Sequence, residues 1–389
     1  MGGVSDASRS PRARAHRRLR QVLESRVVGA LATPHGIDHH LVTLGAGWAT
    51  ADPPARVVDA RRTTPGTVTL TLRPGPRWAG HQAGQHVTLT VPVGGARRSR
   101  CFSIASSAHT PGGTVELTVK ATGRGGVSDH LVAGGCPGQS VQLSPPAGTF
   151  VLPAQRPPHV VMVSGGSGIT PVLSMLRTLH DEGHPGTVSF LHYARAPADV
   201  VAAAELARLA ARHPAWRIVV ALTGPAGAAG PPSMPDAPAV ARLCRLAGRF
   251  RADHLSALAP GAAQAPVWVC GPGRLAADVA SAWRAAGDAP VHVERYRLDP
   301  PPAAGSGGRV RFTRSGVEVV DDGRPLLVQA EGAGLAPAHG CRAGQCHTCV
   351  RRMPAGAVRD LRSGDVVDEP GALVQICVSV PEGGVEIDL

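Results

Sequence analysis

The pattern of apolar and polar residues changes several times along the chain. From Val57 to about residue 145, short runs such as TVTLTL, HVTLTV, TVELTV and SVQLSP alternate apolar and polar positions between Gly and Pro turns. A period of two is typical of strands that bury one face, and regularly spaced short strands indicate an antiparallel barrel. We therefore expect a β-barrel domain over residues 55–156.

From residue 158 the rhythm is different. Apolar runs (HVVMVSGG, TVSFLHYAR, RIVVALTG and PVWVCGP) alternate with helical stretches, which is typical of a doubly wound parallel sheet in an α/β domain. We place this domain at residues 157–298. The run DPPPAAGSGG at 299–308 is a linker by composition. RVRFTRSGVEVV, a short helix and two closing strands then outline a β-grasp domain at 309–389, so the chain is predicted to be multidomain.

Four cysteines near the end carry the most specific signal. They are Cys341, Cys346, Cys349 and Cys377. The first three follow the C-x4-C-x2-C spacing of plant-type ferredoxins, in which a distant fourth thiolate completes a 2Fe-2S cluster. A four-cysteine zinc site is the alternative, but zinc normally takes paired C-x2-C knuckles, and here the fourth cysteine stands alone. The sequence predicts a 2Fe-2S site.

Charge is concentrated at the N-terminus. The 389 residues have a formal net charge of +12, and residues 1–26 contain seven arginines. A solvated tail and docking on an anionic membrane are two readings of this basic extension, which we place at residues 1–54. An aromatic content of 3% and the lack of any recognisable nucleic-acid module argue against nucleic-acid binding. Because no apolar stretch reaches about 18 residues, we expect a cytoplasmic protein.

Two motifs in the barrel region suggest a flavin site. RSRCFSIASS contains Arg100, Phe102 and Ser103 in an R-x-[YF]-S pattern; an arginine can neutralise a flavin phosphate, an aromatic ring can cover the isoalloxazine, and a small hydroxyl can lie near N5. Further on, GRGGVSDHL enters a helix, where backbone N–H groups can bind a diphosphate. The residues expected there are Gly125, Gly126, Val127 and Ser128.

Two further motifs suggest a nucleotide site in the second domain. VVMVSGGSGITP runs from a strand through a Gly-rich turn into a helix, although it is not the G-x-G-x-x-G fingerprint. The candidate residues are Gly165, Gly166, Gly168 and Thr170. WVCGPG places Cys270 and Gly271 at the carboxyl end of another strand, where open sheets bind ligands, although Cys270 could equally be a small buried hydrophobe. Arg195 in HYARAP could pair with a 2′-phosphate, which favours NADPH over NADH.

The order of these motifs, R-x-[YF]-S, G-G-x-S, G-G-x-G-I-T-P, C-G-P and a plant-type ferredoxin, resembles the ferredoxin-NADP reductase superfamily. The chain is most similar to the fused bacterial flavin reductases of the phthalate dioxygenase reductase and acyl-CoA desaturase electron-transfer type. The resemblance covers about residues 56–389. It implies that Arg100, Phe102 and Ser103 contact the flavin. The resemblance adds further positions: Val119 and Lys120 at the flavin edge, Cys270 beside the nicotinamide and Glu294 close to the flavin.

One departure from the family pattern leaves the identity of the flavin open. His86 stands where the family usually has Tyr or Phe, so FMN remains an alternative to FAD. The resemblance implies that NADPH reduces the flavin, that the flavin reduces the 2Fe-2S cluster, and that a protein acceptor takes the electrons. Catalytic roles are expected for Ser103, Cys270 and Glu294. The likeness of the lead segment and of the ending SVPEGGVEIDL to the desaturase-partner branch makes a membrane-bound fatty-acyl desaturase the first expectation for the acceptor. The alternatives are a Rieske-type oxygenase or demethylase, or a redox sensor without turnover.

Overall fold

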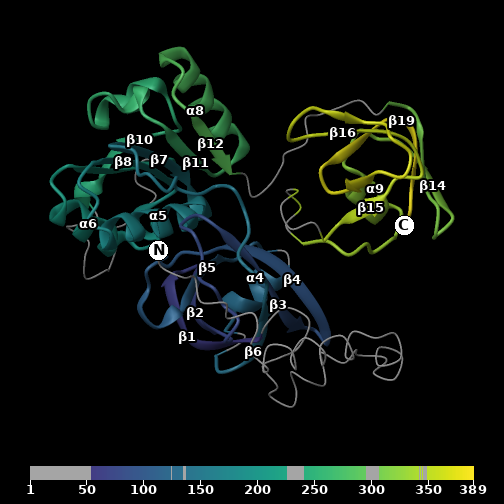
Figure 1. The fold of residues 1–389 in the computed structure, drawn as a ribbon, viewed down its shortest axis with the longest axis horizontal. Coiled ribbons are helices and arrows are strands. Elements are labelled where there is room, and N and C mark those ends of the chain that lie inside the picture. Colours follow the sequence, from purple (N-terminus) through teal and green to yellow (C-terminus); the bar gives the residue numbers. More distant parts are fainter. Residues whose placement is uncertain are drawn as a thin grey trace, which may run out of the picture.

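The computed structural model describes residues 54–123, 125–134, 137–225, 241–294, 306–340, 342, 344 and 348–389. Three folded parts follow one another along the chain (Figure 1): a barrel drawn in purple and blue, a parallel sheet with its helices in teal and green, and a smaller yellow domain. This arrangement confirms the predicted fold class. Within the described residues, no helix is long and apolar enough to cross a membrane.

The first sheet is antiparallel, in the order β4-β3-β6-β1-β2-β5. Its strands are β1 (Pro54–Thr64), β2 (Thr67–Pro74), β3 (His86–Val93), β4 (Ala96–Ser103), β5 (Val115–Lys120) and β6 (Ser140–Leu143). The alternation predicted from the sequence puts Leu70, Leu72 and Leu89 inside, each fully buried. A bridge between Ile104 and Leu117 joins the two edge strands, so the sheet closes into a barrel and loses its exposed edges. The short helix α4 (Val127–Val132) follows β5.

The second sheet is parallel, in the order β10-β9-β8-β7-β11-β12. Its strands are β7 (His159–Gly165), β8 (Thr187–Ala194), β9 (Trp216–Leu222), β10 (Cys244–Ala247), β11 (Val267–Cys270) and β12 (Val291–Glu294). Its helices are α5 (Ile169–Asp181), α6 (Ala203–Arg212) and α8 (Gly273–Ala286). The chain first builds outward from β7 on one side and then returns to its other side with β11. This reversal creates a topological switch point between β7 and β11, where sheets of this kind bind ligands.

The C-terminal domain has a mixed five-stranded sheet, in the order β14-β13-β19-β16-β17, and a separate pair, β15-β18. The strands are β13 (Arg309–Phe312), β14 (Val317–Val320), β15 (Val350–Arg352), β16 (Ala355–Asp360), β17 (Val366–Val367), β18 (Leu373–Gln375) and β19 (Ser379–Ile387). Helix α9 (Leu326–Gly332) buries Leu326 and Leu327 in the same core as Phe312 and Ile387. A sheet with one crossing helix matches the predicted β-grasp outline.

Residues next to the barrel strands pack into the hydrophobic core on one face of the parallel sheet. Phe150 and Leu152, just after the barrel, are buried in the same cluster as Met175 of α5 and Trp268 of β11. The indole Nε1 of Trp268 also donates a hydrogen bond to the carbonyl of Val151, at 3.0 Å. The start of β11 is therefore held against the segment that directly follows the barrel.

Candidate active site

The barrel carries its predicted flavin residues on two neighbouring segments. Strand β4 ends at Ser103, which is 5% exposed, and β5 ends at Lys120. The Ile104–Leu117 bridge brings these two strand ends together. Phe102 packs partly buried against the barrel core. The side chain of Val119 lies wholly inside that core, so any contact of Val119 with a flavin would come from its backbone.

The glycines before α4 fit the close approach of a ligand. Gly125 has a left-handed φ of 69°, which glycine adopts without strain. Gly126 has an ordinary φ of −100°, and a side chain there would meet nothing within 4 Å. Neither backbone conformation nor packing therefore explains the glycine at 126, whereas a bound diphosphate would. Asp129 orders this loop by accepting hydrogen bonds from the amides of Gly123 at 2.8 Å and Gly126 at 3.3 Å.

Two loops interlock at the switch point of the parallel sheet. The first contains Gly166 and Gly168 and follows β7, which ends at Gly165, and the second contains Gly271 after β11. A Cβ at Gly168 would lie 2.1 Å from the carbonyl oxygen of Cys270, and one at Gly271 would lie 3.0 Å from the amide nitrogen of Gly165. Gly166 has a left-handed φ of 57°. Only glycines allow the two loops to approach this closely.

The loop after β7 faces the barrel across a narrow pocket. Thr118 and Lys120 line this pocket from β5, and Gly166, Ser167 and Thr170 line it from the loop and the start of α5. The ammonium group and the helix N-terminus both favour a negatively charged ligand. The pocket thus brings a predicted flavin-edge residue, Lys120, next to the predicted nucleotide loop.

A row of buried polar side chains crosses the carboxyl end of the parallel sheet. Ser164 pairs in register with His192 on one side and with Cys270 on the other, and Cys270 pairs with Glu294. Residues in one register row of a parallel sheet point to the same face. All four are almost wholly buried. The thiol of Cys270 donates to Oε2 of Glu294 at 3.6 Å.

His86 connects this row to the barrel. Its Nδ1 lies 3.9 Å from Oε1 of Glu294, and its strand position is directly opposite Ser103 in the β3–β4 pair. His86 therefore lies between Ser103, its strand neighbour, and Glu294, which in turn contacts Cys270. The sequence identified His86 only as a departure from the family pattern, because a contact over 208 positions leaves no local signal.

His192 is a buried member of this row that sequence reasoning missed. Its Nδ1 is 2.8 Å from the hydroxyl of Ser164, and its Nε2 has no hydrogen-bond partner among the described residues. Burial, with the nearby charge of Lys120, lowers the pKa of His192 to about 3. The ring is therefore neutral at physiological pH. Its only sequence signal was an unusual histidine within the apolar run TVSFLHYAR.

Arg195 lies one residue after β8, at the same edge of the sheet. Its side chain is 76% exposed and its Nε is 4.0 Å from Asp199. Asp199 also lines the pocket that contains Lys120 and Gly166. An exposed guanidinium at the carboxyl edge is accessible to a phosphate of a bound nucleotide.

The described part of the C-terminal domain contains two of the four predicted cluster cysteines. Cys349 and Cys377 are 2% and 5% exposed and belong to one core cluster. Strands β15 and β18 pair Val350 with Gln375, and the amide of Ile376 donates to the carbonyl of Cys349 at 3.4 Å. The backbones that carry these two thiols are therefore adjacent, as two ligands of one cluster require. Cys341 and Cys346 lie outside the described residues.

Gly344, which lies between the first two predicted cysteines in the sequence, is held by two side chains. The carbonyl of Gly344 accepts hydrogen bonds from Nε2 of Gln375 at 3.0 Å and from the guanidinium of Arg362 at 2.6 Å. Gly344 has a left-handed φ of 70°. Arg362 also pairs with Asp360, so its orientation is set from both sides. The two buried thiols of Cys349 and Cys377 and the held position of Gly344 fit a 2Fe-2S cluster.

Comparisons with known proteins agree with the three-part architecture. Residues 57–152 match the oxidoreductase FAD-binding domain, and residues 162–281 match the oxidoreductase NAD-binding domain. Residues 310–382 match the 2Fe-2S iron-sulfur cluster binding domain. The structure of phthalate dioxygenase reductase has the same fold, with a TM-score of 0.55 at 22% identity, over 87% of this chain and 98% of that one.

Two relatives from Mycobacterium tuberculosis are similar over most of the chain. An NADPH oxidoreductase is 37% identical over 94% of this chain and 91% of its own length. The ferredoxin reductase component of 3-ketosteroid-9-alpha-monooxygenase is 30% identical over 79% of this chain and 84% of its own. The chain belongs to the ferredoxin-NADP reductase family, among the members that carry FAD-binding, NAD-binding and 2Fe-2S domains together. It is an NAD(P)H-dependent electron-transfer reductase that uses FAD and a 2Fe-2S cluster.

The family assignment defines the tasks of the site. When bound, FAD would accept one hydride, which carries two electrons, and would pass these electrons singly to a 2Fe-2S cluster, which accepts one at a time. This chain has to position a nicotinamide against the flavin site and exclude water from the space between. The interlocked glycine loops and the buried row from His192 to Glu294 are suited to both tasks.

Proposed function

We propose that this reductase delivers electrons to the oxygenase component of a hydroxylating or demethylating system. Support comes from relatives of similar length whose names state an acceptor. One is the 3-ketosteroid-9-alpha-monooxygenase component, and another is the stachydrine N-demethylase reductase subunit of Rhizobium meliloti, 26% identical over 88% of this chain and 97% of its own. The desaturase expected from the sequence rested on the lead segment and on the ending SVPEGGVEIDL. The lead segment lies outside the described residues, and no relative named above supports a desaturase.

An acceptor assay tests this proposal. The purified reductase and NADPH are mixed with a Rieske-type oxygenase component, or with membranes that contain an acyl desaturase, and product formation is measured. We expect turnover with the oxygenase. A Cys377→Ser variant is the matched control, because it removes one cluster ligand while leaving the flavin and nucleotide domains intact. Turnover with the desaturase alone would contradict the proposal.

Within the site, we propose that the hydroxyl of Ser103 lies near flavin N5, that Cys270 lies beside the nicotinamide and that Glu294 lies close to the flavin. The contacts through His86 and the burial of all three support these roles. Ser103→Ala should slow flavin reduction by about 10-fold or more, as removal of a well-placed transition-state hydrogen bond does. Ser99→Ala is the control, because Ser99 lies on the same strand and bonds only Thr90, at 2.7 Å, among the contacts described. Equal rates in the two variants would reject the role of Ser103.

We further propose NADPH as the donor, with Arg195 at its 2′-phosphate. The remaining predicted contacts are Arg100 on a flavin phosphate, Phe102 against the ring, and Gly125 to Ser128 at the diphosphate. We also propose that the chain is divided into domains at residues 55–156, 157–298 and 309–389, with a linker at 299–308.

Peripheral membrane contact through residues 1–26 stays a prediction. Co-sedimentation with anionic vesicles should fall when those residues are deleted, and unchanged binding would contradict it.

A further inference from the structure

One face of α5 is attached to the barrel by three side chains. The hydroxyl of Ser174 donates to the carbonyl of Ser106 at 2.7 Å, and the guanidinium of Arg177 donates to the carbonyl of Ala105 at 2.8 Å. Thr178 Oγ1 accepts from the amide of Ala108 at 3.0 Å. Positions 174, 177 and 178 share one face of a helix. These bonds attach the helix to the barrel segment that directly follows Ser103.

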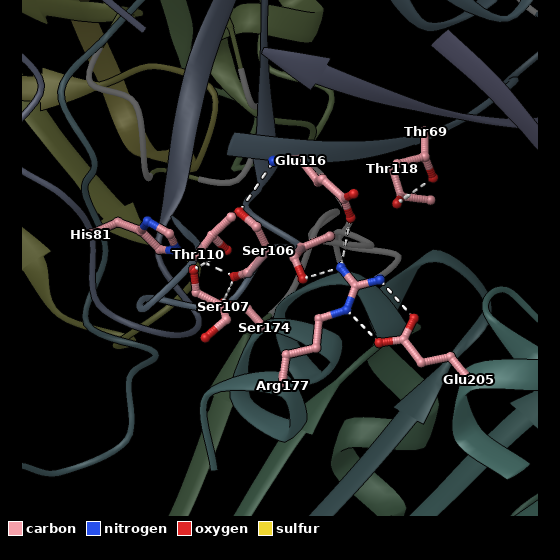
Figure 2. A network of polar contacts seen from close by, with 11 residues as sticks. Thr69, His81, Ser106, Ser107, Thr110, Glu116, Thr118, Ser174, Arg177 and Glu205 are labelled. Atoms are coloured by element: carbon pink, nitrogen blue, oxygen red, sulfur yellow. Dashed lines mark hydrogen bonds and ion pairs between the residues drawn. The ribbon is translucent and has the colours of Figure 1, made fainter. Parts of the chain in front are cut away.

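The strongest of these attachments is ionic. Arg177 donates to Oε2 of Glu116 on β5 at 2.7 Å, and its other side forms a two-point pair with Glu205 on α6, at 2.6 and 2.7 Å. Figure 2 shows the guanidinium between the two carboxylates. We call this arrangement the Arg177 bridge. Burial alone would lower the pKa of Arg177, but the hydrogen bonds and charges of the two carboxylates outweigh it and raise the pKa.

The bridge connects the two halves of the active site. Helix α5 begins at Ile169, directly after the nucleotide loop that contains Gly166 and Gly168. On the barrel side, Glu116 lies on the strand that ends at Lys120, and Ala105 follows Ser103 by two residues. The side chain of Arg177 is only 20% exposed and those of its partners are 27% and 26% exposed. The same guanidinium therefore contacts the segment after Ser103 and the strand that ends at Lys120, next to two of the places predicted to contact the flavin.

Hydrophobic packing between the domains cannot provide this positioning alone. The contact of Phe150 and Met175 is apolar and, because apolar burial has no preferred direction, it permits small sliding movements. Charge-assisted two-point hydrogen bonds set both distance and angle. Hydride transfer depends steeply on geometry, and a misplacement of about 1 Å can lower the rate about 100-fold.

We propose that Arg177 is a positioning residue for hydride transfer. It fixes the nucleotide loop at the start of α5 relative to Ser103 and β5, and so sets the approach of the nicotinamide to the flavin site. This inference rests on the proposed roles of Ser103 and of the loop from Gly166 to Thr170. In this role Arg177 contacts neither cofactor.

The test separates positioning from binding and from later electron transfer. In Arg177→Met, flavin reduction by saturating NADPH in stopped flow should slow by about 10-fold or more. The dissociation constant of NADP⁺ should change less than about threefold, because the nucleotide loop itself is intact. Electron transfer from flavin to cluster after light-driven flavin reduction should keep its wild-type rate. Hydrogen–deuterium exchange should increase in residues 103–108.

Two variants complete the design. Arg156→Met is the matched control: Arg156 also pairs with a carboxylate of the α5 end, Glu182, at 2.7 Å, but its other bonds go to the carbonyls of Leu152 and Pro153. It should leave flavin reduction unchanged. Glu116→Gln keeps the side-chain shape and weakens only the barrel half of the bridge, so it replaces Arg177→Met if that variant does not fold.

The outcomes are distinguishable. Slower flavin reduction in Glu116→Gln, with wild-type NADP⁺ binding and wild-type Arg156→Met behaviour, supports the bridge. Wild-type reduction rates in Glu116→Gln, or an equal loss in Arg156→Met, overturn it. If Ser103→Ala leaves flavin reduction unchanged, the proposed site fails, and the bridge loses its role with it.

Discussion

Replacing Gly168 by alanine tests the interlocked loops at the switch point. Gly168 has an ordinary φ of −62°, so alanine is compatible with its backbone. The new Cβ would nevertheless lie 2.1 Å from the carbonyl oxygen of Cys270 and 2.6 Å from its carbonyl carbon. Both are backbone atoms of β11, so no side chain can rotate away. Normal contact requires that the loop and the start of α5 move by roughly 1 Å.

Two measured quantities should change in Gly168→Ala. Overpacking of this kind typically lowers the free energy of unfolding by about 1–3 kcal/mol. A displacement of roughly 1 Å at the nicotinamide site should slow flavin reduction by NADPH about 100-fold. The assays are urea unfolding and anaerobic stopped-flow absorbance at the flavin band.

Gly183→Ala provides the matched control at the other end of α5. Gly183 has a left-handed φ of 62° and open space around it, so alanine there costs about 1–2 kcal/mol of backbone strain without a clash. Its stability should therefore fall comparably while flavin reduction keeps its wild-type rate. If Gly168→Ala also reduces flavin at the wild-type rate, the loop does not lie against β11 in the working enzyme, and the reasoning fails.

Three further predictions concern charge and protonation. The pKa of His192 in the folded protein is about 3, below its ordinary value of 6.5, so the unfolded state binds the proton more readily. As the pH falls from 7 to 5, this group should therefore lower the free energy of unfolding by about 2 kcal/mol. In urea titrations, His192→Asn should lose that part of the pH dependence. Arg362→Ala breaks a charged hydrogen bond to the carbonyl of Gly344, worth about 1.5–3 kcal/mol, and should speed the loss of the cluster absorbance on warming. Arg359→Ala is the control and should not, because its pair with Glu382 is exposed. Arg195→Ala should raise the KM for NADPH about 10-fold and leave that for NADH unchanged; an equal change for both coenzymes would contradict the 2′-phosphate contact.

The sequence predicted the elements of this fold because their signals are local. Alternation over six residues predicted β2, β3 and β5, and apolar runs followed by glycines predicted β7 and β11 with the loops after them. The polar face of β2 shows the limit of such patterns. Thr67 and Thr69 are 1% and 5% exposed, since the outer face of this strand is covered, which alternation alone does not reveal.

The contacts that organise the site are non-local and could not be predicted. His86 meets Glu294 across 208 positions, and Arg177 meets Glu116 across 61 positions. Neither contact leaves a periodic pattern or a fixed spacing in the sequence, because both contacts arise only when the barrel packs against the parallel sheet. The lead at residues 1–53 and most of the predicted linker lie outside the described residues.

The most direct test of the central claim is an anaerobic reaction with NADPH followed by flavin absorbance and by the electron paramagnetic resonance signal of a reduced 2Fe-2S centre. In the wild type, flavin bleaching should precede the cluster signal. In Cys377→Ser, flavin bleaching should persist without that signal. A wild-type cluster signal that appears at the same rate after the flavin has been removed would contradict electron flow from NADPH through FAD to the cluster.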